Sequence, residues 1–312
     1  VAAIENGGVA AMEVLARDLK ALGLYAARSL SFDGVEYELL EHALTDEQRR
    51  IYDSYAAAFQ IIHNNLDAAM QAAGITSFEH GTLNRQAKSA ARSAFESTKQ
   101  RFFNHLITAM QTPSAIRSIA RDLEAGHAAG VQIASTGGAL QDRRLADIPA
   151  DEWGDVSFDI TPREYVLDYL AHSFPVQLFE PCTDGEGNLS SRPAYDGGGN
   201  PVVSREACRR RDAMIEKLAS LPPVPGALDQ IVQHFGTDEV AEVTGRSRRI
   251  VPRMGEDGHV RFAVENRPGS ANIGETHAFM DDEKRILVFS EAGGTGRSYH
   301  ADLGAKNQRR RI

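Results

Sequence analysis

The sequence predicts an α/β protein: a parallel sheet with helices on both faces, preceded by an α-helical subdomain and interrupted by an insertion. Three short apolar segments, 129–136, 240–245 and 285–290, have the composition of buried strands. Helix-like segments 226–235 and 271–282 precede the second and third of them. Apolar strands that alternate with helices are typical of a parallel sheet that is covered on both faces.

The first 45 residues are predicted to form a helix and a β-hairpin. Residues 9–22 repeat apolar side chains at helical spacing. The following stretch, 24–44, is rich in β-forming residues on both sides of Asp33-Gly34, a dipeptide that favours hairpin turns. We therefore expect 1–45 to be a separate segment that leads into the rest of the chain.

Residues 46–125 are predicted to form a helical accessory subdomain. Thr45 and Gln48 match a capping box, in which each side chain bonds the backbone N–H of the other at a helix start. The helix that they begin carries aromatic and aliphatic residues at three- and four-residue steps. A second helical region covers 84–124, and Pro113 is expected to break it because proline cannot donate a helical hydrogen bond.

Residues 126–312 hold the predicted sheet, and an insertion at 137–222 interrupts it. Within the insertion, Thr161 is the expected N-cap of a helix that has Pro162 in its first turn. Residues 183–201, in which Gly, Asn, Ser and Pro dominate, are expected to form a flexible loop. The sequence does not indicate what the insertion does.

The composition is that of an ordinary globular protein, with 42% hydrophobic and 25% charged residues. No run approaches the roughly 18–20 apolar residues that a membrane-spanning helix needs, so we expect no membrane span. Cys182 and Cys208 lack the spacing of a metal site or a disulfide framework, which fits a reducing, cytoplasmic location. No metal site is predicted. Because the chain begins with Val1, we expect a piece of a longer protein.

The net charge of −9 argues against a protein that binds nucleic acid by bulk attraction, but the basic residues are clustered. Residues 246–253 contain four arginines and no acid, and residues 297–311 contain five basic residues and one aspartate. An arginine run alone usually marks a solvated face. Each cluster, however, follows the end of a predicted strand, and parallel sheets bind ligands beyond the carboxyl ends of their strands. The clusters therefore favour an anion-binding edge.

The turn after the last strand, EAGGTGRS (291–298), does not match the common glycine-rich nucleotide motifs. It lacks the final glycine of GxGxxG and the lysine of GxxxxGK[ST], and the chain holds no GxSxG serine motif. Two interpretations remain. The turn is either a nest of backbone amides for an anion, with hydroxyls from Thr295 and Ser298 and charge from Arg297, or a tight turn without a ligand.

Several of these stretches together resemble one protein family. ILVFSEAGGTGRSYHADLGAKNQRRR (286–311) resembles motif V and its continuation in the C-terminal helicase lobe of the strawberry notch family, which belongs to the superfamily 2 helicases. GHAAGVQIASTGGA (126–139) resembles motif IV, and FGTDEVAEVTGRSRRIV (235–251) resembles the next family strand with its arginine-rich turn. Residues 26–53 resemble the link from the first motor lobe to the second. The resemblance covers nearly the whole chain.

The resemblance implies that 126–312 is an incomplete RecA-like helicase lobe, the second of two lobes that bind ATP between them in an ATP-dependent helicase or translocase. In such motors the first lobe carries the phosphate loop and the acidic Mg²⁺ motif, and neither is present here. The arginine-bearing motif VI is absent as well, so the chain holds no complete catalytic set. ATP and Mg²⁺ are expected to bind mainly to the missing first lobe of the same parent chain.

The nucleic-acid partner that the resemblance implies is a single strand of DNA or RNA, contacted through its phosphates because a motor must step along any sequence. The residues expected to contact it are Thr295, Gly296, Arg297 and Ser298, then Ser135 and Thr136, then Thr244, Gly245 and Arg246. The residues expected to face the ATP cleft are Glu291, Gly293 and Gly294. The alternative is a non-catalytic module, derived from a helicase lobe, that docks nucleic acid or a protein.

Overall fold

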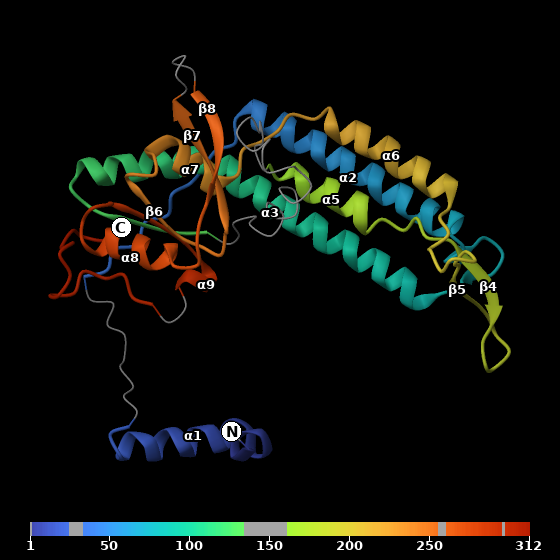
Figure 1. Ribbon diagram of the computed structural model, residues 1–312, viewed down its shortest axis with the longest axis horizontal. Coiled ribbons are helices and arrows are strands. Elements are labelled where there is room, and N and C mark those ends of the chain that lie inside the picture. Colours follow the sequence, from blue (N-terminus) through green and yellow to red (C-terminus); the bar gives the residue numbers. More distant parts are fainter. Residues whose placement is uncertain (1, 25–33, 134–160, 255–259, 295–296) are drawn as a thin grey trace. The chain divides into compact units, whose positions relative to one another are not determined.

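The structure is a computed structural model that describes residues 2–24, 34–133, 161–254, 260–294 and 297–312 (Figure 1). It divides into two compact units, 1–41 and 42–312. The first unit contains helix α1 (Ala2–Ala21), which begins seven residues before the helix expected at 9–22 and ends one residue earlier. Residues 35–45 form no strand, so the expected second arm of the hairpin is wrong. An isolated two-stranded hairpin is only marginally stable, and Val35, Tyr37, Leu39 and Leu40 of this stretch are exposed.

The second unit consists of a helical part and a sheet part. The described elements of the helical part are α2 (Asp46–Ala72), β1 (Thr76–Ser77), β2 (Gly81–Thr82), α3 (Arg85–Glu124), α5 (Arg163–His172), β4 (Phe179–Thr183), β5 (Leu189–Pro193) and α6 (Arg205–Ala219). Those of the sheet part are β3 (Ala129–Ile133), α7 (Ala227–Phe235), β6 (Val240–Val243), β7 (Arg248–Met254), β8 (Val260–Asn266), α8 (Ala271–Met280), β9 (Ile286–Ser290) and α9 (Glu291–Gly294). None of the described helices is both long enough and apolar enough to cross a membrane.

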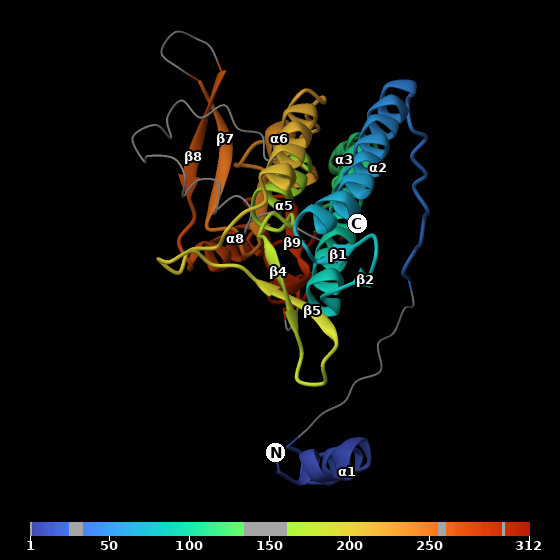
Figure 2. The same cartoon turned by 90° about the vertical axis from the view of Figure 1, so that its right-hand side faces the viewer.

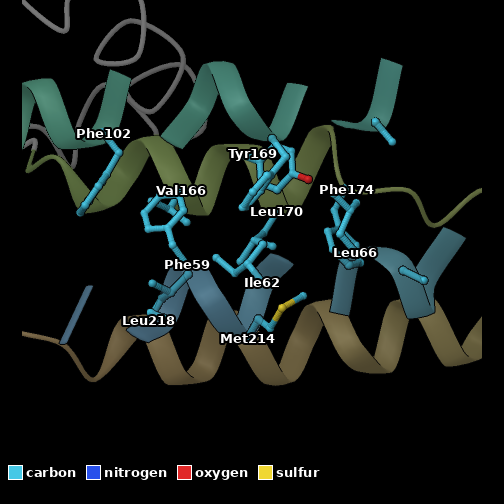
Figure 3. Packing of buried hydrophobic residues seen from close by; sticks show 14 of the residues in the cluster. Phe59, Ile62, Leu66, Phe102, Val166, Tyr169, Leu170, Phe174, Met214 and Leu218 are labelled. Carbon is cyan, nitrogen blue, oxygen red and sulfur yellow. The ribbon is translucent and has the colours of Figure 1, made fainter. Parts of the chain in front are cut away.

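One apolar core is shared by α2, α3, α5 and α6 (Figures 2 and 3). The predicted capping box begins α2: Thr45 Oγ1 accepts from Gln48 N at 3.1 Å, and Gln48 Oε1 accepts from Thr45 N at 3.0 Å. The buried side chains come from all four helices, among them Phe59, Ile62 and Leu66 of α2, Phe102 of α3, Val166, Tyr169 and Leu170 of α5, and Met214 and Leu218 of α6. Residues 161–219 of the expected insertion therefore complete the core of the helical subdomain.

Helix α3 runs without interruption through Pro113, so the expected break is wrong. A proline here leaves the carbonyl of Ala109, four residues earlier, without its helical donor. Gln230 of α7 supplies a replacement, since its Nε2 donates to Ala109 O at 3.0 Å. The neighbouring carbonyl, Met110 O, accepts from Gln48 Nε2 at 2.8 Å. Hydrogen bonds from other helices thus support α3 across the proline.

The start of α5 differs by one residue from the expected one. Pro162 already has helical angles, with φ −48° and ψ −30°, and the first helical residue is Arg163. The backbone carbonyl of Thr161 accepts from Glu164 N at 3.0 Å, but its hydroxyl caps nothing. Thr161 Oγ1 is buried without a hydrogen-bond partner among the described residues. The helix was predicted correctly, and its side-chain cap was not.

Residues 183–201 contain an ordered hairpin end and a second tight turn, so the expected flexible loop is wrong. Strand β5 pairs antiparallel with β4. Two aspartates hold the turns: Asp184 Oδ1 accepts from Asn188 N at 2.8 Å, and Asp196 Oδ1 accepts from Asn200 N at 2.9 Å. Bonds from an aspartate side chain to the backbone order a glycine-rich turn that composition alone suggests to be loose.

Within the described residues, β3, β9 and β6 form one parallel sheet, as predicted, and their order in it is β3–β9–β6. The central strand, β9, alternates between two apolar clusters, which is the period of a pleated strand. Ile286 and Val288 belong to the cluster that includes residues of α3 and α7. Leu287 belongs to the cluster that includes Phe279 of α8. Helices therefore cover both faces of the sheet.

Candidate functional site at the carboxyl edge of the sheet

The carboxyl ends of β6 and β9 lie side by side, because the two strands are parallel neighbours with Val243 opposite Phe289. On the other side of β9, β3 ends with Ile133 opposite Ser290. The turns that follow β6 and β9 therefore emerge at one edge of the sheet, as the sequence predicts. The residues expected at this edge that lie outside the described part of the chain are Ser135, Thr136, Thr295 and Gly296.

The turn after β9 is anchored against the end of β6. Its first four residues, Glu291–Gly294, form the single helical turn α9. A Cβ atom at Gly293 would lie 2.3 Å from Val243 O, so only glycine lets the turn approach β6 this closely. Tyr299 donates its hydroxyl to Gly293 O at 2.6 Å, and its ring centroid lies 5.5 Å from that of Phe289. These contacts fix the turn to the sheet; that it faces an ATP cleft stays a prediction.

Arg297 and Ser298 lie on the exposed side of this turn. The Arg297 N–H lies 3.5 Å from Gly294 O, which ties the exposed segment to α9. Among the described residues, no carboxylate pairs with the Arg297 guanidinium. Ser298 Oγ hydrogen-bonds the ring of His300. Glu291 is also exposed. Within the described residues, the turn thus exposes an arginine without a carboxylate partner, a hydroxyl that is bonded to His300, and the carboxylate of Glu291.

The turn after β6 is held by a buried ion-pair network. Glu242 is fully buried, and its two carboxylate oxygens accept from Nε and Nη2 of Arg246, both at 3.0 Å. Nη1 of Arg246 pairs with Asp229 Oδ1 of α7 at 2.7 Å. Thr244 donates its hydroxyl to Glu242 Oε1 at 2.5 Å. Thr244 and Arg246 are therefore occupied inside the protein, whereas Gly245 between them is exposed.

Two residues that the sequence did not single out complete the network. Arg267, which follows β8, places Nη1 3.2 Å from Glu242 Oε1 and also donates to Arg246 O at 2.9 Å. Asn272 of α8 donates to Thr244 O at 2.8 Å. The sequence feature that could have indicated this network is Glu242, because a carboxylate inside the apolar strand VAEV needs a cationic partner.

The members of the network stabilise one another's charges against the cost of burial. Burial alone raises the pKa of Glu242, but Arg246 and Arg267 lower it overall. Burial by itself lowers the pKa of Arg246, but the neighbouring carboxylates of Asp229 and Glu242 raise this pKa above its ordinary value. The pKa of Arg267 is lowered, chiefly by burial. The charges of two arginines and two carboxylates sum to zero. The network therefore holds the turn in a fixed shape and adds no net charge to it.

Part of the second arginine cluster is also used inside the fold. Arg309 Nε pairs with Asp282 Oδ1 at 2.7 Å. The guanidinium of Arg311 lies 4.9 Å from the ring centroid of Phe279. The backbone of residues 310–312 hydrogen-bonds the start of β3 in a parallel arrangement. These arginines therefore help to fasten the chain beside the sheet, and Arg297 differs from them in being exposed and unpaired within the described structure.

A parallel sheet with helices on both faces, and a glycine turn at the carboxyl end of its central strand, are consistent with a RecA-like C-terminal helicase lobe. Family models agree with this class. Residues 226–312 match the C-terminal domain on strawberry notch homologues. Residues 1–54 match the family described as P-loop containing NTP hydrolase pore-1. No solved structure matches the chain significantly.

Curated strawberry notch proteins are similar to the chain over its whole length. The rat protein strawberry notch homolog 1 is 27% identical over 378 aligned residues, which cover 100% of this chain and 29% of that protein. The human protein strawberry notch homolog 2 is 25% identical, covering 99% of this chain and 27% of that protein. The chicken homolog 1 is 38% identical over 36% of this chain and 10% of that protein. Together, the match of residues 226–312 and the similarity along the whole chain support the strawberry notch family, and the chain spans less than a third of the length of these relatives.

Proposed function

We propose that this chain is the second motor lobe of an ATP-dependent superfamily 2 helicase or translocase, and that the carboxyl edge of its sheet grips the phosphates of a nucleic-acid single strand. Similarity to the strawberry notch family supports a helicase-like fragment. The match of residues 1–54 to a P-loop NTP hydrolase family supports a nucleotide-hydrolysing first lobe in the longer protein. ATP hydrolysis and movement along nucleic acid are proposed for that longer protein as a whole.

The observation that carries the proposal is the anchored turn after β9. Gly293 and Tyr299 fix it against the end of β6, and Arg297 and Ser298 of this turn are exposed, as is Gly245 in the turn after β6. Backbone amides, a hydroxyl and a guanidinium that converge at a rigid edge suit phosphate oxygens. Contacts of these groups with phosphates do not depend on the base sequence, and a motor that moves along any sequence requires such contacts.

Thr244 and Arg246 act in this proposal as positioning residues. A phosphate contact from the Arg246 guanidinium would require it to leave both Glu242 and Asp229. Separating a buried charge from its partners costs about 3–5 kcal/mol. A surface phosphate contact does not offset a cost of that size, so the arginine is better suited to shaping the turn, and Gly245 to offering its backbone.

ATP and Mg²⁺ are proposed to bind mainly to the first lobe, with Glu291, Gly293 and Gly294 facing the cleft from this side. Within the described part of the chain, no group of three or more His, Cys, Asp and Glu side chains is placed to hold a metal ion. We assign the described residues no catalytic step. Their proposed task is to hold the nucleic acid while the first lobe supplies the chemistry.

The proposed edge is tested by replacing Arg297 with alanine and measuring binding by fluorescence anisotropy. The ligands are two labelled single strands of unrelated sequence, each at low and high salt. A phosphate contact carries no sequence information, so Arg297→Ala should weaken both by a similar factor. It should also lower the slope of log affinity against log salt by about 0.7, the value for one phosphate contact on a single strand. Arg205→Ala, which removes an exposed arginine from α6, is the control.

Two results would refute the proposed edge. One is an Arg297→Ala variant that binds both strands like the wild type at low salt. The other is a loss confined to one of the two strands, which would indicate a base reader. The motor itself is tested in the longer protein with its first lobe intact: stimulation of ATP hydrolysis by single strands supports it. Binding without any stimulation would favour the alternative, a non-catalytic docking module.

A further inference from the structure

A groove runs between α2 and α3 in the helical part. The two helices are in contact, and Figure 2 shows them side by side, whereas α5 lies between them in the view of Figure 1. Large aromatic side chains lie between them: the ring centroids of Tyr52 and Phe103 are 5.2 Å apart, and those of Phe59 and Phe102 are 5.0 Å apart. Side chains of this size hold the two backbones apart, and hollows lined by α2, α3 and the β1–β2 hairpin remain between them.

One hollow of the groove, about 430 Å³ in volume, has aromatic walls. Tyr52 and Phe103 line it and are half-buried, and His63 is exposed, so part of the ring surface is open to solvent. Lys99 lines the same hollow, with its Nζ 5.5 Å from the ring centroid of Phe95. Open ring surface next to a cation suits a planar group that is linked to a negative charge, as a nucleobase is.

The next hollow, about 410 Å³ in volume, has a basic and hydroxyl lining. A third hollow of about 440 Å³ adjoins it and shares Thr82, Lys88 and Arg92 with it. Lys88 Nζ donates to Thr82 Oγ1 at 2.8 Å, and Arg85 and Ser89 line the outer part. Cations and hydroxyls that converge in a hollow are the side chains that phosphate oxygens prefer.

The hollows follow one another along a single groove. Residues 52–63 of α2 line the aromatic hollow, and residues 67–71 of the same helix line the basic one. On α3 the order is 95–103 and then 88–92. Between Lys88 and Phe103, α3 rises by about 22 Å, at roughly 1.5 Å per residue. The groove is therefore long enough for several units of an extended chain.

Charge at the groove points to an anionic ligand. Among the described residues that line it, four are basic and two are acidic. Each acid is paired within the groove, Asp67 with Arg92 at 3.2 Å and Glu96 with Lys99 at 2.6 Å. Lys88 and Arg85 have no carboxylate partner in the described part of the chain. A local surplus of positive charge on a chain with net charge −9 attracts a polyanion to this place.

From these observations we infer that the α2–α3 groove is a second binding site for single-stranded nucleic acid, separate from the sheet edge. A base lies against the rings of the aromatic hollow, and the phosphates lie along Lys88, Arg85 and Arg92. The inference rests on the proposed function in taking the same class of ligand. A peptide matches the groove less well. An acidic peptide would pair with the cations but leave the aromatic ring surfaces uncovered. An apolar helix would cover the rings but bury the cations without an anionic partner, which is costly.

The test uses the 312-residue chain and fluorescence anisotropy with two labelled strands of equal length. One is an oligothymidylate of roughly 12 nucleotides, within the range of single-strand sites, and the other has the same backbone without bases. Lys88→Ala/Arg92→Ala should lower the affinity for both strands and reduce the salt slope by about 1.4, twice the value for one phosphate. Tyr52→Leu should weaken binding of the oligothymidylate by about fivefold or more and leave the base-free strand unchanged.

The matched control is Arg205→Ala/Arg209→Ala, which removes two exposed arginines from α6 outside the groove. The inference is overturned if the Lys88/Arg92 variant binds like this control, or if Tyr52→Leu weakens both strands equally. It is also overturned if an oligoglutamate of equal charge binds as tightly as the oligothymidylate, since the groove would then be a peptide site. Arg297→Ala, measured in the same assay, distinguishes the two proposals. If the groove variants weaken binding and Arg297→Ala does not, the proposed site at the sheet edge is refuted and the site in the groove is retained.

Discussion

Replacing Glu242 with glutamine should strongly destabilise the sheet part, because this carboxylate balances two buried arginines. Glu242 is fully buried, and the side chains of Arg246 and Arg267 are 2% and 4% exposed. Glutamine keeps the shape of the side chain but removes its charge, and its amide nitrogen would face donors of the guanidinium groups. The change therefore separates the charge effect from a packing effect.

The loss of unfolding free energy in Glu242→Gln depends on which partners Arg246 and Arg267 keep. Removing one partner of a buried ion pair costs about 3–5 kcal/mol. Arg246 keeps Asp229 at 2.7 Å, and Arg267 keeps neutral acceptors such as Arg246 O at 2.9 Å, so we expect the lower end, about 3 kcal/mol. For a unit of this size, each kcal/mol shifts the melting temperature by about 2–4 °C, which predicts a decrease of about 6–12 °C.

Thermal unfolding followed by circular dichroism at neutral pH measures this shift. Glu180→Gln is the matched control, because Glu180 pairs with Arg192 on the surface and the two side chains are 49% and 69% exposed. An exposed pair contributes about 0–1 kcal/mol, so the control should melt within about 4 °C of the wild type. Equal melting temperatures for Glu242→Gln and Glu180→Gln would refute the role of the network.

The pH dependence provides a second check on Glu242. Its pKa in the fold lies below the ordinary value of 4.5, so the unfolded chain binds this proton more readily than the folded one. The stability that the charged carboxylate contributes is therefore fully present above pH 4.5 and is lost as the pH falls through the lower, folded value. The difference in melting temperature between wild type and Glu242→Gln should narrow below pH 4.5.

Three further predictions concern the chain alone. Because it carries no phosphate loop, the purified chain should release no phosphate from ATP above background, with or without single-stranded DNA; turnover that persists through purification would contradict this. Gln230→Ala leaves Ala109 O without a donor and should cost about 1–3 kcal/mol in thermal unfolding, whereas the exposed Gln60→Ala should cost almost nothing. Burial raises the pKa of Tyr55 from 10 to about 12, so its stability contribution is complete below pH 10 and is lost towards pH 12. In an ultraviolet titration, Tyr55→Phe should remove a tyrosinate step near pH 12; loss of a step near pH 10 would contradict the burial effect.

The sheet could be predicted from the sequence because its strands are short apolar runs that alternate with helices. Local patterns also gave the capping box at Thr45 and the helices on both sides of β6. The helix through Pro113 could not be predicted, because the donor that satisfies Ala109 O comes from Gln230, 121 residues away. Proline removes a local bond in every context, and only the tertiary structure decides whether another group replaces it.

The roles of the arginines could not be predicted for a related reason. Their clustering after strand ends is visible in the sequence, but their partners come from other elements. Arg249 pairs with Glu265 across the β7–β8 hairpin at 2.8 Å, and Arg246 pairs with Asp229 of α7. A charge cluster therefore indicates where charge gathers along the chain. Whether it binds a ligand or a buried carboxylate depends on the fold.

The network at the end of β6 separates two tasks that an arginine-rich edge could otherwise combine. Buried arginines that are fully neutralised give the Thr244–Arg246 turn one shape and add no net charge to it. In the proposed function, the exposed Arg297 on the neighbouring turn contacts a phosphate, and that contact can be made and released without disturbing the shape. A motor lobe that moves along a strand needs such weak, repeated contacts on a rigid edge. Substitution of the buried arginines should therefore mainly lower the melting temperature. Substitution of Arg297 should mainly lower the affinity for single strands and its dependence on salt.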